Sequence, residues 1–181
     1  MQLRAAVILA IITLLYPSMS IMKIFPHDVI VQTAAEYLGA DRAGSLEFRF
    51  DNEKILLSHA SKRFLFGWGG WGRNRARDAE TGEDVSVTDG RWIITLGIFG
   101  LIGFIAQFGL LAVSIFRAKT AAKLIKEKQE QTLFAAHALL VGIIMIDQLP
   151  NASLAPWLWL VVGVLLGRSE MIIESSKQKK V

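Results

Sequence analysis

The hydrophobic residues of this chain are gathered into long blocks, and the polar residues lie between them. The blocks cover residues 1–22, 92–116, 132–149 and 154–167. The second block has 25 consecutive residues without a charged side chain. A helix of that length can cross the roughly 30 Å hydrocarbon core of a bilayer while satisfying its own backbone hydrogen bonds. The pattern therefore predicts an all-α membrane protein with about four transmembrane helices.

The block at residues 1–22 permits two interpretations. Arg4 is its only charged residue, and Pro17 lies near its end, where we expect a kink. One interpretation is a signal peptide with Ser18-Met19-Ser20 as a loose cleavage site. The other, which we favour, is a retained membrane span, because the apolar stretch is long for a signal-peptide core. Both interpretations place the following region outside the cytoplasm.

Basic residues beside the blocks predict the orientation of the chain in a membrane. Residues 117–131 and 168–181 both carry clusters of lysine and arginine. Short basic segments of this kind stay in the cytoplasm. We therefore expect a cytoplasmic loop at 117–131, a cytoplasmic tail at 168–181, and an external region of helices and loops at 23–91.

The external region is predicted to contain two helices and a short hairpin. Apolar residues recur at helical spacing over Pro26–Leu38, which suggests an amphipathic helix at the membrane interface. We expect Gly39–Gly44 to end it and a second helix of mixed charge to cover Ser45–Phe64. Residues Arg73–Thr88 then suggest a hairpin that turns at Thr81-Gly82.

The second hydrophobic block contains glycines at every third position. They are Gly97, Gly100 and Gly103. A stripe of small residues lets the backbone of another helix approach closely. Glycine is also common in membrane spans for no such reason, so both interpretations are open.

Composition narrows the chemistry further. The chain has no cysteine, which excludes disulfides and thiolate metal ligands. Its histidines, His27, His59 and His137, are scattered without a metal-ligand spacing. The net charge of +4 reflects basic flanks and a basic loop, and it does not suggest a surface for nucleic acid. We expect no metal, no cofactor and no nucleic-acid partner.

Two segments resemble the C-terminal part of the O-antigen ligase and O-antigen polymerase family. After Arg49 they read FLFGWGGWGRNR (Phe64 to Arg75) and VTDGRWIITLGIFGLIGFIAQFGLL (Val87 to Leu111). The resemblance implies a multi-pass protein of the bacterial inner membrane. Such a protein transfers a glycan from a polyprenyl-pyrophosphate carrier to an acceptor on the periplasmic face, so the region at 23–91 would be periplasmic.

The chain departs from that family in two ways. The family has many more membrane spans, so we expect this chain to be a C-terminal piece, a truncated reading frame or one part of a split protein, and in the last case the missing N-terminal spans lie on another chain. The ligases carry His-Asn where this chain has Thr88-Asp89. The absent histidine favours a polymerase-like or uncharacterised member over a ligase.

The resemblance and the required chemistry single out candidate site residues. Glycosyl transfer from a pyrophosphate needs stabilisation of the leaving group and activation of the acceptor hydroxyl. Arginine forks pair with phosphate oxygens, and glycine lets backbone N–H groups approach them. The candidate catalytic residues are Asp89, Arg49 and Arg91, and the candidate substrate-binding residues are Arg73, Arg75, Gly67, Gly69, Gly70, Trp68, Trp71 and His59.

Each of these assignments has an alternative. Asp89 is the candidate base, but it also suits the N-terminal cap of the helix that follows. The arginines can pair with nearby carboxylates or lipid headgroups instead of a substrate. The tryptophans can stack on sugar rings or anchor the chain at the interface. His59 can reach the glycine-rich segment or serve only to hold its own helix in place.

The sequence thus predicts a glycan polymerase or ligase-like membrane protein that binds a lipid-linked oligosaccharide and membrane lipids. The alternatives are a non-catalytic membrane subunit, a truncated and inactive family member, and a general lipid-binding or transport component.

Overall fold

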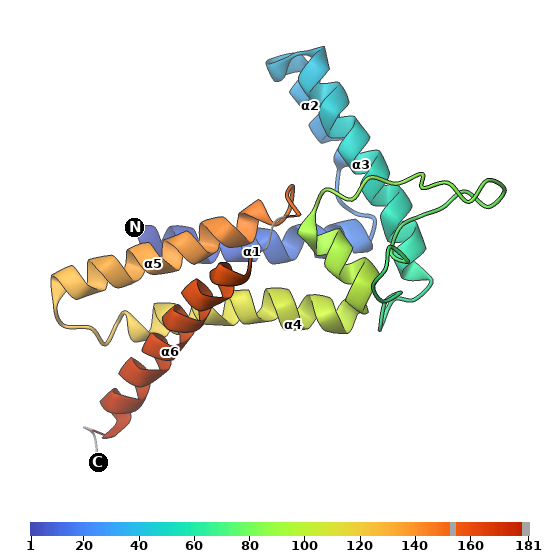
Figure 1. Cartoon of the computed structure of the whole chain (residues 1–181). Coiled ribbons are helices and arrows are strands. Elements are labelled where there is room, and N and C mark those ends of the chain that lie inside the picture. The colour runs from blue at the N-terminus through green and yellow to red at the C-terminus, as the bar shows by residue number, and fades with distance from the viewer. Residues whose placement is uncertain (153–154, 179–181) are drawn as a thin grey trace. The chain divides into compact units, whose positions relative to one another are not determined.

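A computed structural model describes residues 1–152 and 155–178 (Figure 1). Over these residues the chain is helical and contains no β-strand, which confirms the all-α fold class. The described helices are α1 (Gln2–Ile21), α2 (His27–Leu38), α3 (Ala40–Ser61), α4 (Arg91–Ala121), α5 (Lys128–Asp147) and α6 (Pro156–Gln178).

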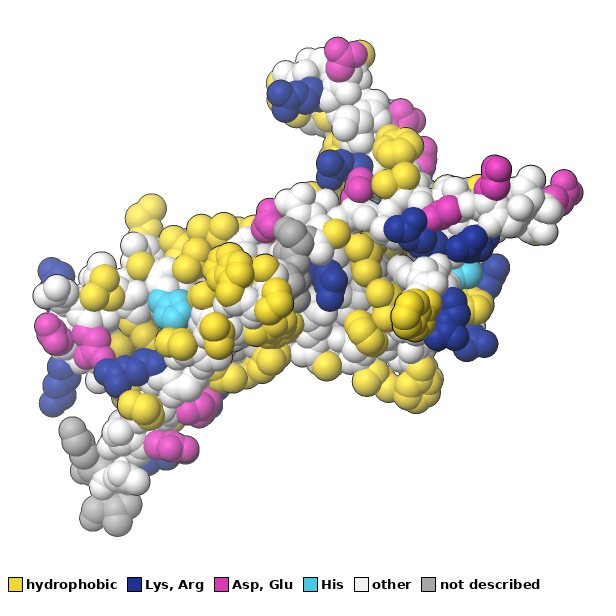
Figure 2. All heavy atoms as spheres, viewed as in Figure 1, with side chains coloured by type: hydrophobic (Ala, Val, Ile, Leu, Met, Phe, Trp, Pro, Cys, Tyr) yellow, Lys and Arg dark blue, Asp and Glu magenta, His cyan; other side chains and the backbone are white. Residues whose placement is uncertain are grey.

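Four helices, α1, α4, α5 and α6, are long and apolar enough to cross a membrane. They coincide with the four predicted blocks. The chain therefore has the helices of a multi-pass membrane protein. On the face in Figure 2, hydrophobic side chains gather over α5 and α6, and charged side chains lie near the ends of these helices. Exposed leucine, isoleucine, valine and tryptophan residues on both helices suit contact with lipid.

Several predicted boundaries differ from the observed ones. Only Gly39 separates α2 from α3, and its φ of 90° ends the first helix. We predicted a break over Gly39–Gly44, but the observed break is Gly39 alone, and Gly44 lies inside α3. The loop predicted at 117–131 is shorter, because α4 continues to Ala121 and α5 begins at Lys128. Residues 168–178 continue α6 instead of forming a tail.

The structure divides into two compact units, and one of them holds most of the apolar helices. Its described residues are 1–15, 105–149 and 155–178. A Cβ placed on Gly142 of α5 would come within 3.0 Å of the Cα of Ala6, so these backbones are in close contact. His137 Nε2 lies 2.8 Å from the carbonyl oxygen of Val161. The imidazole of His137 therefore links α5 to the backbone of α6. Polar side chains in membrane proteins often form such hydrogen bonds between helices.

Ion pairs hold the polar ends of helices in the same unit. Arg117 of α4 makes a two-pronged pair with Glu170 of α6, and Arg168 of α6 pairs with Glu130 of α5. All four residues flank apolar segments. The basic residues that predicted the cytoplasmic side thus also tie neighbouring helices together.

The second unit comprises residues 16–104 and 150–152. In it α2 and α3 pack side by side as a helical hairpin (Figure 1). Phe50 and Leu56 of α3 are buried, as are Trp92 and Leu96 of α4. α2 buries none of its residues completely. Its apolar residues remain available, and the predicted contact of α2 with a membrane interface stays a prediction.

The hairpin predicted at Arg73–Thr88 is reduced to a single antiparallel bridge between Arg77 and Asp84. The chain does reverse at Thr81-Gly82, where Gly82 has a φ of 73° and its N–H donates to the carbonyl of Asp78. Residues 73–88 are all described, and no strand extends from the turn. The flanking residues are mostly polar and exposed, so they offer no apolar face on which a sheet could pack.

Candidate functional site

The glycine-rich segment after α3 is built into a break in α4. Gly100 interrupts that helix with φ 67° and ψ −167°. The carbonyls of Gly97 and Ile98, which lose their partners in α4, accept hydrogen bonds from Trp68 N (2.8 Å) and Gly69 N (2.9 Å). On the other side of the break, Leu101 N and Ile102 N donate to the carbonyls of Phe64 and Leu65 at 2.8 and 3.3 Å. The segment thus supplies the hydrogen bonds that α4 loses at the break. An apolar helix needs them, because lipid cannot bond its backbone groups.

Two glycines make this close contact possible. A Cβ on Gly100 would overlap the carbonyl group of Leu65. A Cβ on Gly67 would lie 2.5 Å from the carbonyl oxygen of Ile98. Both glycines also have positive φ, which glycine adopts without strain. The predicted glycine stripe of α4 therefore faces this segment at Gly100, rather than another helix.

The backbone donors of the glycine-rich segment are consequently in use. Gly67 N donates to the carbonyl of Arg63, and Trp68 N and Gly69 N donate to α4. In this structure the N–H groups of Gly67 and Gly69 donate to protein carbonyls, which does not favour their use for a phosphate. The predicted binding of substrate by these two glycines stays a prediction. The corresponding role of Gly70 stays a prediction.

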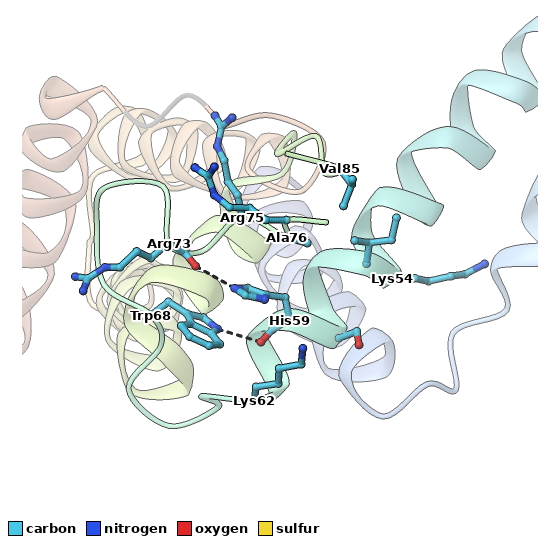
Figure 3. Close-up of a pocket in the computed structure, with 11 residues that line it drawn as sticks. Lys54, His59, Lys62, Trp68, Arg73, Arg75, Ala76 and Val85 are labelled. Atoms are coloured by element: carbon cyan, nitrogen blue, oxygen red, sulfur yellow. Dashed lines mark hydrogen bonds between the residues drawn. The ribbon is translucent and has the colours of Figure 1, made fainter. Parts of the chain in front are cut away.

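A pocket of about 770 Å³ lies between α3 and the segment that follows it (Figure 3). We call it the cationic pocket, because five basic side chains line it and none of its described lining residues is acidic. The basic residues are Lys54, Lys62, Arg73, Arg75 and Arg77, and the other lining residues are Ile55, Ser58, His59, Trp68, Ala76 and Val85.

His59 and Trp68 form one wall of the cationic pocket. Their rings stack at a centroid distance of 4.4 Å and an interplanar angle of 12°. Trp68 Nε1 donates to the carbonyl of His59 at 3.0 Å, and His59 Nε2 lies 2.9 Å from the carbonyl oxygen of Arg73 (Figure 3). The guanidinium of Arg63 lies 4.7 Å from the centre of the Trp68 ring. These contacts favour the structural interpretation of His59 and occupy a face of Trp68 that a sugar would need.

The arginines of the pocket do not converge on one point. Figure 3 shows the guanidinium groups of Arg73 and Arg75 pointing in different directions. Arg75 Nη1 donates to Asp84 Oδ2 at 2.7 Å, and this hydrogen bond lowers the pKa of Asp84. Arg73 donates through Nε to the carbonyl of Gly70, and among the described residues no carboxylate pairs with it. Of the two predicted arginines in the pocket, Arg73 is therefore the one without a carboxylate partner among the described residues.

The candidate catalytic residues lie outside the cationic pocket. Arg49 Nε is 4.0 Å from Asp89 Oδ2, and both side chains are nearly half exposed. Arg49 Nη1 also donates to the carbonyl of Pro150 at 3.3 Å, and Arg91 N donates to the carbonyl of Asn151 at 3.0 Å. The structure brings Arg49 and Asp89 together as an ion pair at the start of α4. It does not bring them to the pocket that Arg73 lines.

Trp71 differs from Trp68 in being almost fully exposed. Its exposed fraction is 97%, and Phe66 and Leu65 in the same segment are exposed by 75% and 55%. Phe99 and Ile102, on either side of the break in α4, are exposed as well. Aromatic residues beside an apolar helix suit the membrane interface. This environment favours the interpretation of Trp71 as an anchor.

Sequence reasoning missed a buried polar cluster formed by Tyr16, His27 and Glu53. The hydroxyl of Tyr16 donates to Glu53 Oε2 at 2.5 Å. Burial raises the pKa of Glu53, although the side chains of Tyr16 and Ser20 oppose that shift. Glu53 is one of several charges in a helix of mixed polarity, and no local signal distinguishes it. Only the packing of α3 reveals that it is buried.

No protein-family model, curated protein or solved structure matches this chain. Within residues 1–152 and 155–178, no group of three or more potential ligand side chains is arranged to hold a metal ion. The resemblance to the O-antigen ligase and polymerase family stays a prediction that depends on the motifs alone.

Proposed function

We propose that this protein binds a polyprenyl-pyrophosphate-linked oligosaccharide and acts in cell-surface polysaccharide synthesis as a polymerase-like or ligase-like component. The motifs after Arg49 motivate the choice of substrate. The observation that carries the proposal is the cationic pocket, where five basic side chains and no described acidic one line the same cavity. A diphosphate is attracted to such a pocket, because each guanidinium adds a charge-assisted hydrogen bond.

The proposal places the protein in the inner membrane of a bacterium. The two basic segments face the cytoplasm, and α2, α3 and the cationic pocket face the periplasm. The glycine-rich segment holds the pocket beside α4, through the hydrogen bonds at Gly97 and Ile98. A lipid carrier that remains in the bilayer could present its headgroup there.

A specific observation favours a second candidate, a non-catalytic membrane subunit. The candidate base Asp89 pairs with Arg49 and does not line the cationic pocket. A bound diphosphate would therefore lack a carboxylate base among the residues that line its site. In this form the chain binds the lipid-linked substrate and another polypeptide supplies the chemistry.

Binding to the cationic pocket is tested with farnesyl diphosphate, a short soluble polyprenyl diphosphate, and the protein in phosphatidylcholine nanodiscs. Arg73→Ala should weaken binding about fivefold, since it removes one charge-assisted contact. Arg42→Ala is the matched control, because Arg42 is exposed on α3 and does not line the pocket. Equal affinities for the wild type and Arg73→Ala would contradict the binding proposal.

The two candidate functions are separated by supplying the purified chain with a lipid-linked oligosaccharide and measuring glycan length on gels. Elongation that Asp89→Asn abolishes would support a polymerase-like enzyme. Binding without elongation, restored to elongation only by a second membrane protein, would support the subunit.

A further inference from the structure

A second cavity of about 630 Å³ borders α3 and shares only Lys54 and Ser58 with the cationic pocket. It is lined by the end of α1, by the segment leading into α2, by the first turn of α2, and by α3 with Phe64 just after it. Apolar side chains supply much of its wall. Among them are Phe25, Val29, Leu57 and Phe64. Its volume is that of a site for a ligand of lipid or drug size.

Three polar atoms in the wall of this cavity are buried without a hydrogen bond among the described residues. They are Ser20 Oγ, His27 Nε2 and Glu53 Oε1. Ser20 is only 3% exposed, and the side chains of His27 and Glu53 are 13% and 12% exposed. The other oxygen of Glu53 accepts from Tyr16. His27 Nε2 and Glu53 Oε1 are within ion-pair distance, and the Ser20 side chain acts on the pKa of Glu53, but none of the three atoms has a hydrogen bond of ordinary geometry. Leaving buried polar groups without a hydrogen bond is costly, so these atoms indicate a missing polar partner.

The geometry restricts what that partner can be. Glu53 Oε1 and His27 Nε2 are 3.7 Å apart, which is too long for a hydrogen bond between them. One oxygen that carries a proton can lie within hydrogen-bond distance of both atoms. It can donate to Glu53 Oε1 and accept from the imidazole N–H. Phe25 and Phe50 pack edge-on against the imidazole, with centroids 4.8 and 4.5 Å away, and so fix the ring.

The charges around the cavity favour a neutral partner. The carboxyl groups of Asp28 and Glu53 would repel an anion, and the ammonium groups of Lys23 and Lys54 would repel a cation. Burial raises the pKa of Glu53. Burial first, and the charge of Lys54 second, lower the pKa of His27. Both shifts disfavour a full charge on either group, so a bound ion would gain little attraction from them.

We propose that this cavity binds a lipid with a free hydroxyl head group. The hydroxyl bridges Glu53 and His27 beside Ser20, and the apolar body lies against Phe25, Leu57 and Phe64. A single water could bond the polar atoms, but it would leave the part of the cavity lined by Phe25, Leu57 and Phe64 unfilled. Ser20 and Ile21 belong to the end of a helix that can span a membrane, so a lipid-soluble alcohol reaches the cavity from the bilayer.

The experiment uses the full chain in phosphatidylcholine nanodiscs, because that lipid has no free hydroxyl. The probe is 1-hexadecanol with a diazirine on its alkyl chain, and its methyl ether is the matched control probe. After irradiation, the labelled peptides are identified by mass spectrometry. We expect the alcohol to label the peptides containing Phe25 and Leu57 about tenfold more than the ether does, since the ether cannot donate to Glu53.

Two variants separate the polar site from nonspecific labelling. Glu53→Leu and His27→Phe should each reduce labelling of these peptides several-fold, because neither new side chain can bond the hydroxyl, and His27→Phe keeps an aromatic ring between Phe25 and Phe50. Asp51→Asn is the control, because Asp51 is an exposed carboxylate of the same helix paired with Lys54. Equal labelling by the alcohol and the ether in the wild type overturns the proposal without any variant. Labelling confined to the lipid-facing helices overturns it as well.

Discussion

The two cavities beside α3 differ in how exposed their polar groups are and in whether these groups have partners. In the cationic pocket the basic groups are largely exposed, and Arg75 already has a carboxylate partner, Asp84. In the cavity at Glu53 the charges are fewer, but polar atoms are buried without a hydrogen bond among the described residues. A cluster of exposed charges has little effect on the free energy of folding, because water solvates the charges and exposed ion pairs contribute little. The buried carboxylate is the group whose free energy depends on a partner.

Gly100→Ala should have the largest effect. It should disrupt the cationic pocket but not the cavity at Glu53. The added Cβ meets the Leu65 carbonyl at a φ of 67°, so the glycine-rich segment must leave the break. We expect a loss of stability of about 4 kcal/mol or more. The measurement is the thermal midpoint together with binding of farnesyl diphosphate and labelling by the alcohol probe.

The matched control for that change is Gly109→Ala in the same helix. Its Cβ would meet nothing closer than Ile105 Cγ2 at 4.0 Å, so stability should be kept. Loss of diphosphate binding with alcohol labelling retained would confirm that the segment supports only the cationic pocket. Full binding by Gly100→Ala would contradict the role given to the break.

Trp68→Ala should have the next largest effect. It removes the stack on His59 and the hydrogen bond to the His59 carbonyl, at a cost of about 3 kcal/mol. Trp71→Ala removes an exposed side chain and should change stability by less than about 0.5 kcal/mol in detergent. Chemical denaturation followed by circular dichroism compares the two variants. Similar losses for both would show that Trp68 is not a structural wall.

Asp84→Asn should strengthen diphosphate binding about twofold to threefold, because it releases Arg75 from an exposed ion pair worth less than about 1 kcal/mol. The gain should shrink as salt is added. Titrations of farnesyl diphosphate at low and high ionic strength measure it. A weaker affinity at low salt would mean that Asp84 orients Arg75 for the ligand instead of competing with it.

Glu53 should give the smallest effect, a change in the pH dependence of stability. Its pKa in the folded protein is raised above the ordinary 4.5, so the folded state holds the proton more tightly. Its contribution to stability is therefore present at low pH and is lost as the pH rises from about 4.5 through the folded pKa. Glu53→Gln should remove this loss, and thermal midpoints across that range measure it.

His27 must be controlled in this experiment, because its lowered pKa acts in the opposite direction. Its contribution is present above the ordinary pKa of 6.5 and is lost as the pH falls through the folded value. Tyr16, Asp28, Asp51 and Lys54 also bear on the pair. The comparison is therefore made in the His27→Phe background. If adding Glu53→Gln to that background leaves the pH profile unchanged, Glu53 is not buried in solution.

Much of the fold could be predicted from local pattern. The four apolar helices follow from runs of residues that lack charges, and the end of α2 follows from Gly39. Four predicted site residues, His59, Trp68, Arg73 and Arg75, line the cationic pocket, but Lys54, Lys62 and Arg77, which also line it, were not predicted. Arg49, Asp89 and Arg73 are far apart along the chain, and nothing in their spacing shows that Arg49 pairs with Asp89 away from the pocket that Arg73 lines.

The amino-acid sequence by itself determined which segments can cross a membrane, because lipid demands long apolar helices whatever their neighbours are. Only the tertiary structure decided where α4 breaks and which glutamate is buried. Gly100 can break a helix only when another backbone supplies the missing hydrogen bonds, and here residues 64–69 do so. The environment of Glu53 likewise depends on Tyr16, which α1 brings to α3, and on His27 of α2, which lies 3.7 Å away. Both outcomes depend on contacts between segments distant in the chain, and such contacts leave no local pattern.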